Sequence, residues 1–363
     1  MSSASIRALE FYCGIGGLHY ALKKSRPSAE VVAAFDWDPT SCQVYGANHG
    51  DVVQRKDIAT LTPEYLEGFD ADLWLMSPAC QPYTVLNPQA KGAADPRAMS
   101  FLHIVQSVLP EMARKGSQPG YILVENVAGF ESSSTRELLV ETLKDVGYET
   151  MELLLSPLQY GIPNSRLRYY MLARKQPFPK VESEEQEHRV WRHIPGQPIV
   201  NGEGEVNPEV EVRPLKEYLD TQVDASRYVP DKILGKWGRL FDIVKPSSAR
   251  SCCFTRGYTH MVERSGSILQ EAEELDTTQV FDTFLRAQSE GREDALEILR
   301  PLRLRYFTPS ELLRIFAFDE ATFVWPESVS MKTKYRLIGN SVNVRVVQAL
   351  VTYLLAEQEH TMT

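Results

Sequence analysis

Short apolar segments alternate with helical patterns through the first half of the chain, and this alternation narrows the folds that it can adopt. Runs of strand length occur at 6–12, 31–35, 51–54, 72–76, 121–124, 151–155 and 168–173. Helical patterns lie between them, at 18–25, 39–47, 101–115 and 136–146. Strands that alternate with helices predict an α/β fold with a doubly wound sheet. In such a sheet, ligands bind outside the carboxyl ends of the strands.

The pattern changes in the second half of the chain. Residues 176–213 are rich in Pro, Glu and Gly and show little periodicity, which is typical of a linker or a long surface insertion. Helical signals return at Thr308, where a capping box with Glu311 predicts a helix start, and a last helix is expected over 344–356. We therefore expect a large domain, a smaller domain and a C-terminal segment that returns to the large domain, over 1–180, 181–320 and 321–363.

The charge of the chain limits its partners. The 363 residues carry a net charge of −9, and the pI is about 5.4. An acidic chain is not typical of a nucleic-acid binder, although net charge does not exclude a local basic face. Basic residues gather at 166–175, 303–305 and 332–336, whereas acidic residues concentrate at 182–187 and 271–274. Solvated faces are the alternative explanation for all of these runs.

The cysteines and the apolar runs indicate the compartment. The five cysteines include no CxxC pair, so a reduced intracellular protein fits better than a disulfide framework or a zinc site. No apolar run is long enough to span a membrane, and residues 1–9 show no signal-peptide pattern. We therefore expect an intracellular protein, in the cytoplasm, the nucleus or both, with neither a membrane nor a metal as partner.

A glycine cluster, Gly14-Ile15-Gly16-Gly17, stands between the first expected strand and the first expected helix. Glycine lets the backbone approach a ligand closely and adopt a positive φ. The spacing is FxxGxGG, which differs from the dinucleotide-binding pattern GxGxxG. Taken alone, the cluster is equally compatible with a plain tight turn.

Polar and aromatic residues follow the next two expected strands. Asp36 ends the second strand, where it is placed to bind ribose hydroxyls, and Trp37 beside it can stack on an adenine. Asp57 and Ile58 follow the third strand and can meet the edge of the adenine. Because these residues and the glycines lie on successive strand ends, together they favour a cofactor that carries adenosine.

A cysteine lies just past the expected strand at 72–76, in the sequence Ser77-Pro78-Ala79-Cys80-Gln81-Pro82. Proline ends a strand because it lacks the donor that a β-ladder needs, and prolines on both sides stiffen the turn. A lone cysteine is more often a small buried hydrophobe than a nucleophile. A nucleophilic role for Cys80 also requires an electropositive setting that holds the thiolate.

Charged residues flank two further strands at the same expected edge. Glu125 follows the strand at 121–124 and can act as an acid or a hydrogen-bond partner, with a cap or a salt bridge as the alternative. Arg166 and Arg168 lie on one face of an extended segment, because strand residues alternate sides. They can bind phosphate or a base, or support a thiolate, and an ordinary exposed strand is the alternative.

Six motifs, in this order, resemble those of the cytosine-C5 methyltransferases. They span nearly the whole chain and are FxxGxGG from Phe11, Asp36-Trp37, Ser-Pro-Ala-Cys-Gln, Glu125-Asn126-Val127, Arg166-Leu167-Arg168 and Gly339-Asn340-Ser341-Val342. Within that superfamily the chain resembles the second DNA-methyltransferase homologue family, whose members methylate transfer RNA. The pointers are the compact length and two longer runs, Asn164-Ser165-Arg166-Leu167-Arg168-Tyr169 and Cys253-Phe254-Thr255-Arg256-Gly257-Tyr258.

The resemblance implies a Rossmann-like sheet that binds S-adenosylmethionine, with S-adenosylhomocysteine as product, and a smaller target-recognition domain. It implies that the Cys80 thiolate adds to C6 of cytosine, so that C5 can take up the methyl group. Glu125 would hold N3 and the exocyclic amine, and Arg166 and Arg168 would neighbour the base and the thiolate. The substrate would be a cytosine in an unpaired loop, at position 38 of aspartate tRNA, which leaves its stack more easily than a base in duplex DNA.

The same match assigns the remaining site residues. Those implied for the cofactor pocket are Tyr12, Gly14, Ile15, Gly17, Asp36, Trp37, Asp57, Ile58, Asn340 and Ser341. Those implied for target recognition are Cys253, Phe254, Thr255 and Tyr258. A buried thiol pair in a core strand is the alternative explanation for the cysteines at 252–253.

The sequence departs from the family immediately before the proposed nucleophile, where Ala79 stands in place of the usual proline. Alanine leaves one more soft dihedral, and fixing one residue costs about 1–2 kcal/mol. If the whole cost added to the activation free energy of methylation, the rate of methylation would fall roughly tenfold. We therefore expect an active, monomeric enzyme that acts on tRNA. A methyltransferase that acts on DNA and a catalytically silent nucleic-acid-binding protein are the alternatives.

Overall fold

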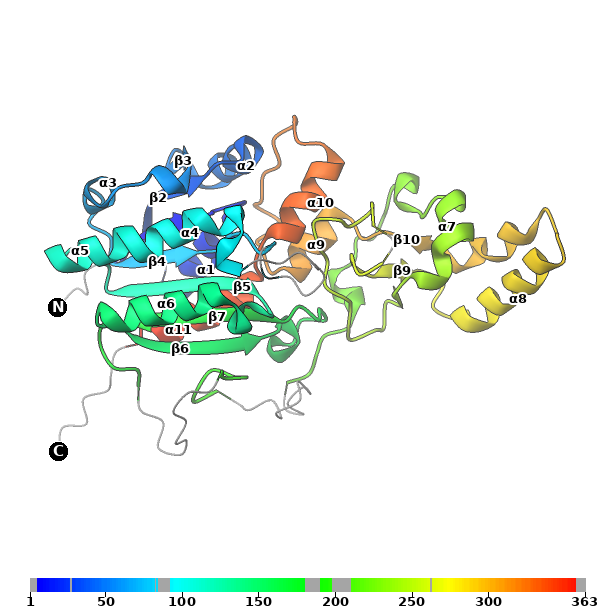
Figure 1. The fold of residues 1–363 in the computed structure, drawn as a ribbon. Helices are drawn as coiled ribbons and strands as arrows, with labels where there is room; N and C mark the ends of the chain where they lie inside the picture. Colours follow the sequence, from blue (N-terminus) through cyan, green and yellow to red (C-terminus); the bar gives the residue numbers. More distant parts are fainter. Residues whose placement is uncertain are drawn as a thin grey trace.

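The computed structural model describes residues 5–26, 28–81, 83, 92–179, 190–197, 210–261 and 263–356 of the chain. Pro82, the acidic run at 182–187 and much of the expected linker lie outside these residues. A seven-stranded sheet forms the centre of the molecule, and a three-stranded sheet lies to one side of it (Figure 1).

The seven strands of the large sheet are β1 (Arg7–Phe11), β2 (Glu30–Asp36), β3 (Val53–Arg55), β4 (Leu73–Met76), β5 (Tyr121–Val127), β6 (Glu149–Leu155) and β7 (Arg168–Arg174). Their order is β3-β2-β1-β4-β5-β7-β6. The first five strands are parallel, and β7 runs antiparallel to both of its neighbours. The chain leaves β1 toward β3 and then returns to the other side of β1 as β4. Such a reversal opens a crevice at the carboxyl ends of β1 and β4, where α/β proteins bind ligands.

Helices cover both faces of this sheet, as a doubly wound fold requires. Their bounds are α1 (Gly17–Ser25), α2 (Pro39–His49), α3 (Pro63–Glu67), α4 (Met99–His103), α5 (Leu109–Lys115), α6 (Ser134–Asp145) and α11 (Val344–Leu354). Ala8 and Leu75 pack with α1 and α11 on one face. Leu9 and Trp74 pack with α4, α5 and α6 on the other, which is the near face in Figure 1. Neighbouring strand residues thus enter opposite cores, which explains why the strands read as continuous apolar runs.

The helix expected at 101–115 begins earlier, at Met99, and contains one wide turn over Ile104–Val108, between α4 and α5. Pro110 explains this turn, because proline lacks the N–H that an α-helix uses and its ring clashes with the carbonyl four residues before it. A π-type turn widens the helix locally and accommodates the ring.

The C-terminal helices complete the large core. The helix α9 (Pro309–Ile315) begins at the expected capping box, in which Thr308 and Glu311 each accept a hydrogen bond from the backbone N–H of the other. Next comes α10 (Met331–Asn340), and α11 then packs along α1. The Arg26 side chain, which follows α1, donates to the carbonyl of Leu355 at 2.8 Å. This hydrogen bond joins the end of α1 to the end of α11 beside the sheet.

The three-stranded sheet belongs to a small lobe, residues 224–305, with its own core. Its elements are α7 (Asp231–Trp237), β8 (Ile243–Val244), β9 (Ile268–Gln270), α8 (Thr277–Ser289) and β10 (Leu304–Arg305). Phe254 and Tyr258 lie within this stretch of sequence but pack in the core of the large sheet. The sequence range of the small lobe therefore does not coincide with one core, and the domain boundaries at 180 and 320 stay predictions. No helix in the described part of the chain is long and apolar enough to cross a membrane.

Candidate active site

Cys80 lies on the turn that follows β4, at the carboxyl edge of the large sheet. Two hydrogen bonds hold this turn. The Asn126 side chain on β5 donates to the carbonyl of Pro78 (Nδ2–O 3.3 Å), and the Tyr83 N–H donates to the carbonyl of Cys80 at 3.0 Å. Asn126 belongs to a motif that the sequence singles out, but its contact with the turn depends on the pairing of β4 with β5.

The Cys80 turn also contacts the glycine loop. The Ser77 hydroxyl donates to the carbonyl of Tyr12, with 3.0 Å between Oγ and O. Tyr12 has a φ of 58°, in the left-handed region that side chains other than glycine rarely adopt. Its hydroxyl is hydrogen-bonded to that of Ser100 at 3.0 Å. This Ser77 hydrogen bond therefore links the turn that carries Cys80 to the predicted cofactor loop, at the place where the strand order reverses.

The glycine loop leaves room for a ligand beside an acidic side chain. Gly14 has a φ of 53°, and a Cβ there would meet no atom within 4 Å. Its N–H donates to the Asp36 carboxylate at 2.9 Å, and burial raises the pKa of Asp36. Trp37, the next residue, is 72% exposed. An open glycine backbone, a carboxylate and an exposed indole on neighbouring strand ends suit a ligand that carries adenosine.

Three other residues predicted for the cofactor pocket are placed differently. Ile15 and Ile58 are buried, and their side chains pack in the cores on opposite faces of the sheet. Asp57 is exposed, and its side chain accepts a hydrogen bond from the Ala59 N–H at 3.0 Å. That bond caps the short turn Ile58–Thr60, so Asp57 has a structural role in addition to the predicted one.

The motif at 339–342 meets both the glycine loop and the recognition segment. A Cβ on Gly339 would lie 2.3 Å from the carbonyl carbon of Thr255, so only glycine permits this approach. A Cβ on Gly17 would lie 2.9 Å from the Ser341 hydroxyl, which brings opposite ends of the sequence together. Asn340, between them, is exposed.

Glu125 lies on β5, beside the strand that carries the Cys80 turn, and is 8% exposed. Arg168 on β7 forms an ion pair with it, with 3.5 Å between Nε and Oε1. Burial raises the pKa of Glu125, and the charges of Arg168 and Arg166 only partly oppose this effect. A carboxyl group with a raised pKa is suited to hold or deliver a proton near neutral pH.

Arg166 is 4% exposed and makes several hydrogen bonds. It donates to the carbonyl of Phe254 at 2.9 Å and to two carbonyls at the end of α10. Its Nη1 lies 3.3 Å from the Cys253 sulfur, and Nη2 of Arg168 lies 3.5 Å from the same atom. Burial raises the pKa of the Cys253 thiol, but the two guanidinium groups outweigh burial and the net pKa is lowered.

The thiol of Cys80 has the opposite setting. Burial raises its pKa, Glu125 raises it further, and the charges of Arg168, Arg166 and Arg256 reduce the effect without cancelling it. Among the described residues, no arginine is hydrogen-bonded to the Cys80 sulfur. The positive charges that a cysteine nucleophile requires therefore lie closest to Cys253, and they act on Cys80 from a greater distance.

Two of the four residues predicted to recognise the target lie in the core. Phe254 and Tyr258 are 0% and 1% exposed, and their rings meet edge to face with 5.1 Å between centroids. The Tyr258 hydroxyl donates to the carbonyl of Ser267 at 2.7 Å. These rings support the segment from beneath, while Cys253 and Thr255 are partly exposed and are its accessible members.

A buried polar network lies behind the glycine loop, and the sequence interpretation missed it. Glu10 on β1 accepts a hydrogen bond from the Tyr45 hydroxyl at 2.8 Å, and this hydroxyl is also hydrogen-bonded to His19 at 2.8 Å. The His19 ring stacks on that of His49, with 3.9 Å between centroids. Burial raises the pKa of Glu10 to about 8 and lowers the pKa of His19 to about 3 and that of His49 to about 4. The only signal in the sequence is one acidic residue within the apolar run at 6–12.

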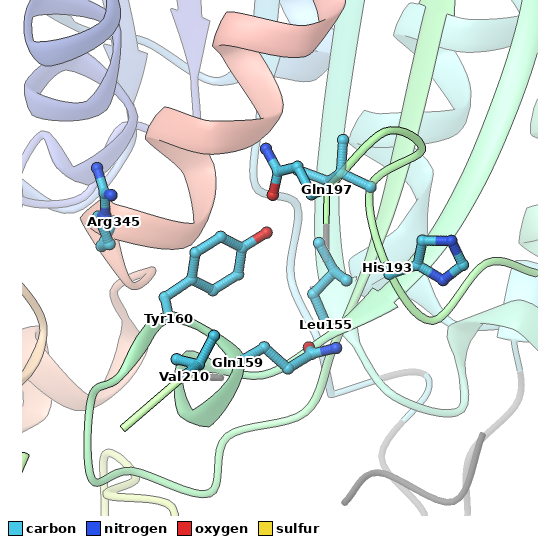
Figure 2. A pocket seen from close by; sticks show the side chains of 8 residues that line it. Leu155, Gln159, Tyr160, His193, Gln197, Val210 and Arg345 are labelled. Carbon is cyan, nitrogen blue, oxygen red and sulfur yellow. The ribbon is translucent and has the colours of Figure 1, made fainter. Parts of the chain in front are cut away.

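A separate cavity of about 260 Å³ lies between the end of β6, the start of α11 and residues 193–197 (Figure 2). Leu155, Tyr160 and Arg345 are among the side chains that line it. None of the predicted site residues does, so this cavity has no part in the site described above.

Residues 6–356 match the family model described as C-5 cytosine-specific DNA methylase. The chain belongs to this family. The matched range includes every residue predicted for the site of this methyltransferase, from Tyr12 to Ser341.

Relatives match the methyltransferase over nearly its whole length. A protein of Schizosaccharomyces pombe named tRNA (cytosine(38)-C(5))-methyltransferase is 40% identical over 98% of this chain and 98% of its own length. The human protein of the same name is 36% identical over 96% of this chain and 99% of its own length. A relative from Dictyostelium discoideum named DNA (cytosine-5)-methyltransferase is 33% identical over 98% of this chain and 95% of its own length.

Solved structures share the fold of the methyltransferase. The crystal structure of S. pombe Dnmt2 methyltransferase matches with a TM-score of 0.76 and 39% identity, over 97% of this chain and 98% of that chain. An Entamoeba histolytica methyltransferase matches with a TM-score of 0.77 and 29% identity, over 98% of this chain and 100% of that one. The Rossmann-like methyltransferase fold expected from the sequence is therefore confirmed.

Proposed function

We propose that this protein methylates C5 of cytosine in transfer RNA. The observation that carries the proposal is that Cys80 and Glu125 both lie beyond the last paired residues of the neighbouring parallel strands β4 and β5, with Arg168 in an ion pair with the carboxyl group. The choice of tRNA is supported by relatives named tRNA (cytosine(38)-C(5))-methyltransferase, which match over nearly their whole length. The same relatives support cytosine 38, in the anticodon loop, as the target, and the family resemblance points to aspartate tRNA.

In the proposed mechanism, Cys80 is the nucleophile. Its thiolate adds to C6 of cytosine, which turns the ring into an enamine with a nucleophilic C5. Glu125 gives a proton to N3 as negative charge develops on the ring, and the raised pKa of Glu125 favours this role. After C5 has gained the methyl group, a water molecule takes the proton from C5, the C6–S bond breaks, and N3 returns its proton to Glu125. The cytosine ring and the thiolate are thereby restored.

S-adenosylmethionine, when bound, supplies the methyl group as an electrophile. We assign its adenosine to the crevice beside β1 and β2, where Asp36 can accept hydrogen bonds from hydroxyls and the exposed Trp37 ring offers a stacking surface. Gly14 leaves the backbone open on the side of the ligand, and Gly17 lets the segment at 341–342 pack against the loop. The other residues assigned to this pocket are Tyr12, Ile15, Asp57, Ile58, Asn340 and Ser341.

An unpaired loop lowers the cost of reaching the base. A base in a duplex must leave its stack, at a cost of a few kcal/mol, and the cost is least for a base that is already single-stranded. Methylation of DNA is the second candidate, because the D. discoideum relative carries that name. A silent nucleic-acid-binding protein is the third, and Ala79 is the observation in its favour.

Incubation with methyl-labelled S-adenosylmethionine and either aspartate tRNA or duplex DNA separates these candidates. We expect label in the tRNA, and none when cytosine 38 is replaced by uracil. Cys80→Ala should remove the label while it keeps the unfolding midpoint and the tRNA affinity of the parent. Label in DNA alone would establish the second candidate, and intact RNA binding without label the third.

A further inference from the structure

The helix α7 and the turn after it carry a stripe of basic side chains. Lys232 and Lys236 lie four residues apart on α7 and share one face of it, and Arg239 lies in the turn Gly238–Leu240 that follows the helix. All three are exposed, and none forms an ion pair with any residue that the structure describes. We call these three residues the α7 stripe.

The opposite face of α7 fixes the direction of the stripe. Leu234 is buried in the core of the small lobe. A Cβ on Gly235 would lie 2.8 Å from the Leu296 side chain, and a Cβ on Gly238 would lie 3.0 Å from the Phe281 ring. The helix therefore packs closely through its small residues, and the α7 stripe points away from the lobe.

Cations elsewhere in the small lobe are mostly neutralised. The arginines in ion pairs with neighbouring carboxylates are Arg250, Arg292, Arg300, Arg303 and Arg305. Asp231, the one acid on α7, is held by Arg300 at 2.9 Å, so it does not compensate the stripe. The other long helix of the lobe, α8, exposes Asp282 and is followed by the exposed Glu290, with Arg286 as its only cation. Positive charge thus gathers on α7 and the turn after it, while α8 carries one acidic and one basic side chain.

An aromatic ring accompanies the stripe. Trp237 is 39% exposed, and Nζ of Lys236 lies 4.8 Å from the centroid of its ring. A cation beside an accessible aromatic ring is the combination with which proteins hold a nucleic-acid strand, because the cation meets phosphate and the ring meets a base or sugar.

We infer that the α7 stripe, with Trp237, docks the phosphate backbone of the RNA substrate outside the loop that carries the target cytosine. The inference rests on the proposed activity on tRNA. The whole chain carries a net charge of −9 and repels a polyanion, so affinity must come from a local surface whose cations form no internal ion pairs. The Cys80 site then takes the base, while the small lobe holds another part of the same RNA.

Charge reversal tests this inference. The triple variant K232E/K236E/R239E is compared with R286E, which reverses one exposed arginine on α8 of the same lobe. Binding of aspartate tRNA is measured by fluorescence anisotropy between about 50 and 200 mM salt. Each phosphate contact adds roughly one unit to the slope of log affinity against log salt. We expect the triple variant to lose about two to three units of slope and about tenfold or more in affinity at low salt. R286E should stay within about twofold of the parent.

Cofactor binding and unfolding midpoints show that each variant is folded. Equal affinity and slope for the triple variant and the parent would overturn the inference, even where the parent methylates tRNA as proposed. An equal loss in R286E would overturn it as well, because the effect would then come from total charge. If the parent itself neither binds nor methylates tRNA, the proposed function fails and the inference fails with it.

Discussion

Arg168 and Glu125 form a largely buried ion pair across β5 and β7, with 3.5 Å between Nε of the arginine and Oε1 of the glutamate. The same guanidinium reaches the Cys253 sulfur at 3.5 Å. Its charge lowers the pKa of Glu125 and that of the Cys80 thiol, against the larger effect of burial on both groups. One side chain therefore lowers the pKa of both the proposed acid and the proposed nucleophile, against the effect of burial.

Arg168→Ala should move the pH dependence of the reaction to higher pH. The rate rises with pH as Cys80 loses its proton and falls again as Glu125 loses its own. Because the positive charge of Arg168 lowers the pKa of both groups, its removal raises both, and both limbs of the profile shift upward. The measurement is kcat/KM against pH. Arg168→Lys keeps the charge and should keep the profile, and an unshifted profile for Arg168→Ala would contradict this account.

Ser77→Ala should uncouple the cofactor loop from the Cys80 turn, because it removes the hydrogen bond to the Tyr12 carbonyl. Ser77 is a positioning residue, so the readout is the reactivity of Cys80 toward iodoacetamide with and without S-adenosylhomocysteine. We expect the cofactor product to change this rate in the parent and to change it much less in the variant, as loss of a coupling free energy requires. Ser77→Thr keeps a hydroxyl and serves as the control. An undiminished effect in Ser77→Ala would show that the bond carries no coupling.

Ala79→Pro should leave the methylation rate unchanged or raise it, up to about tenfold. Proline restores the rigidity that the family has at this position. Among the described residues, the Ala79 N–H donates no hydrogen bond, so proline removes none. Single-turnover rates on tRNA test this prediction, and a large loss of rate in a folded variant would mean that the backbone of the turn does not suit proline.

Glu10→Gln should flatten the pH dependence of stability. Glu10 has a pKa of about 8 in the folded protein and 4.5 as its ordinary value. Its stabilising contribution is complete below about pH 4.5 and is lost as pH rises toward 8, at up to about 1.4 kcal/mol per pH unit. Unfolding in urea near pH 5.5, 7 and 8.5 should show that the free energy of unfolding of the variant increases relative to that of the parent as pH rises. His19 and His49 titrate in both proteins, so parallel curves would contradict the role of Glu10.

Local signals in the sequence were enough to place several site residues. Proline after an apolar run placed Cys80 on a turn at the sheet edge, and the end of the second strand placed Asp36 at the same edge. The sequence predicts Glu125 just after the strand at 121–124, whereas β5 continues to Val127 and Glu125 pairs with Tyr170 of β7. The capping box at Thr308 gave a helix start that the structure confirms. Each of these signals acts within a few residues of the side chain that it places.

Contacts between distant segments could not be predicted in this way. The approach of Arg166 and Arg168 to Cys253 depends on how the recognition segment packs against β7, and no periodicity encodes that packing. The close packing of Gly339 on Thr255 is another such contact. The antiparallel direction of β7 and the neutral network around Glu10 also arise only when the whole sheet has formed.

Mass spectrometry of a trapped adduct shows whether Cys80 forms the covalent bond to the base. Aspartate tRNA with 5-fluorocytosine at position 38 is incubated with the protein and S-adenosylmethionine, because fluorine at C5 blocks the final elimination and the enzyme stays bound. We expect a covalent complex that resists denaturation, is absent in Cys80→Ala, and yields a modified peptide at Cys80. Cys253, whose thiol has the lowered pKa, is the matched internal control. An adduct on Cys253, or methylated tRNA with no adduct at all, would contradict the account.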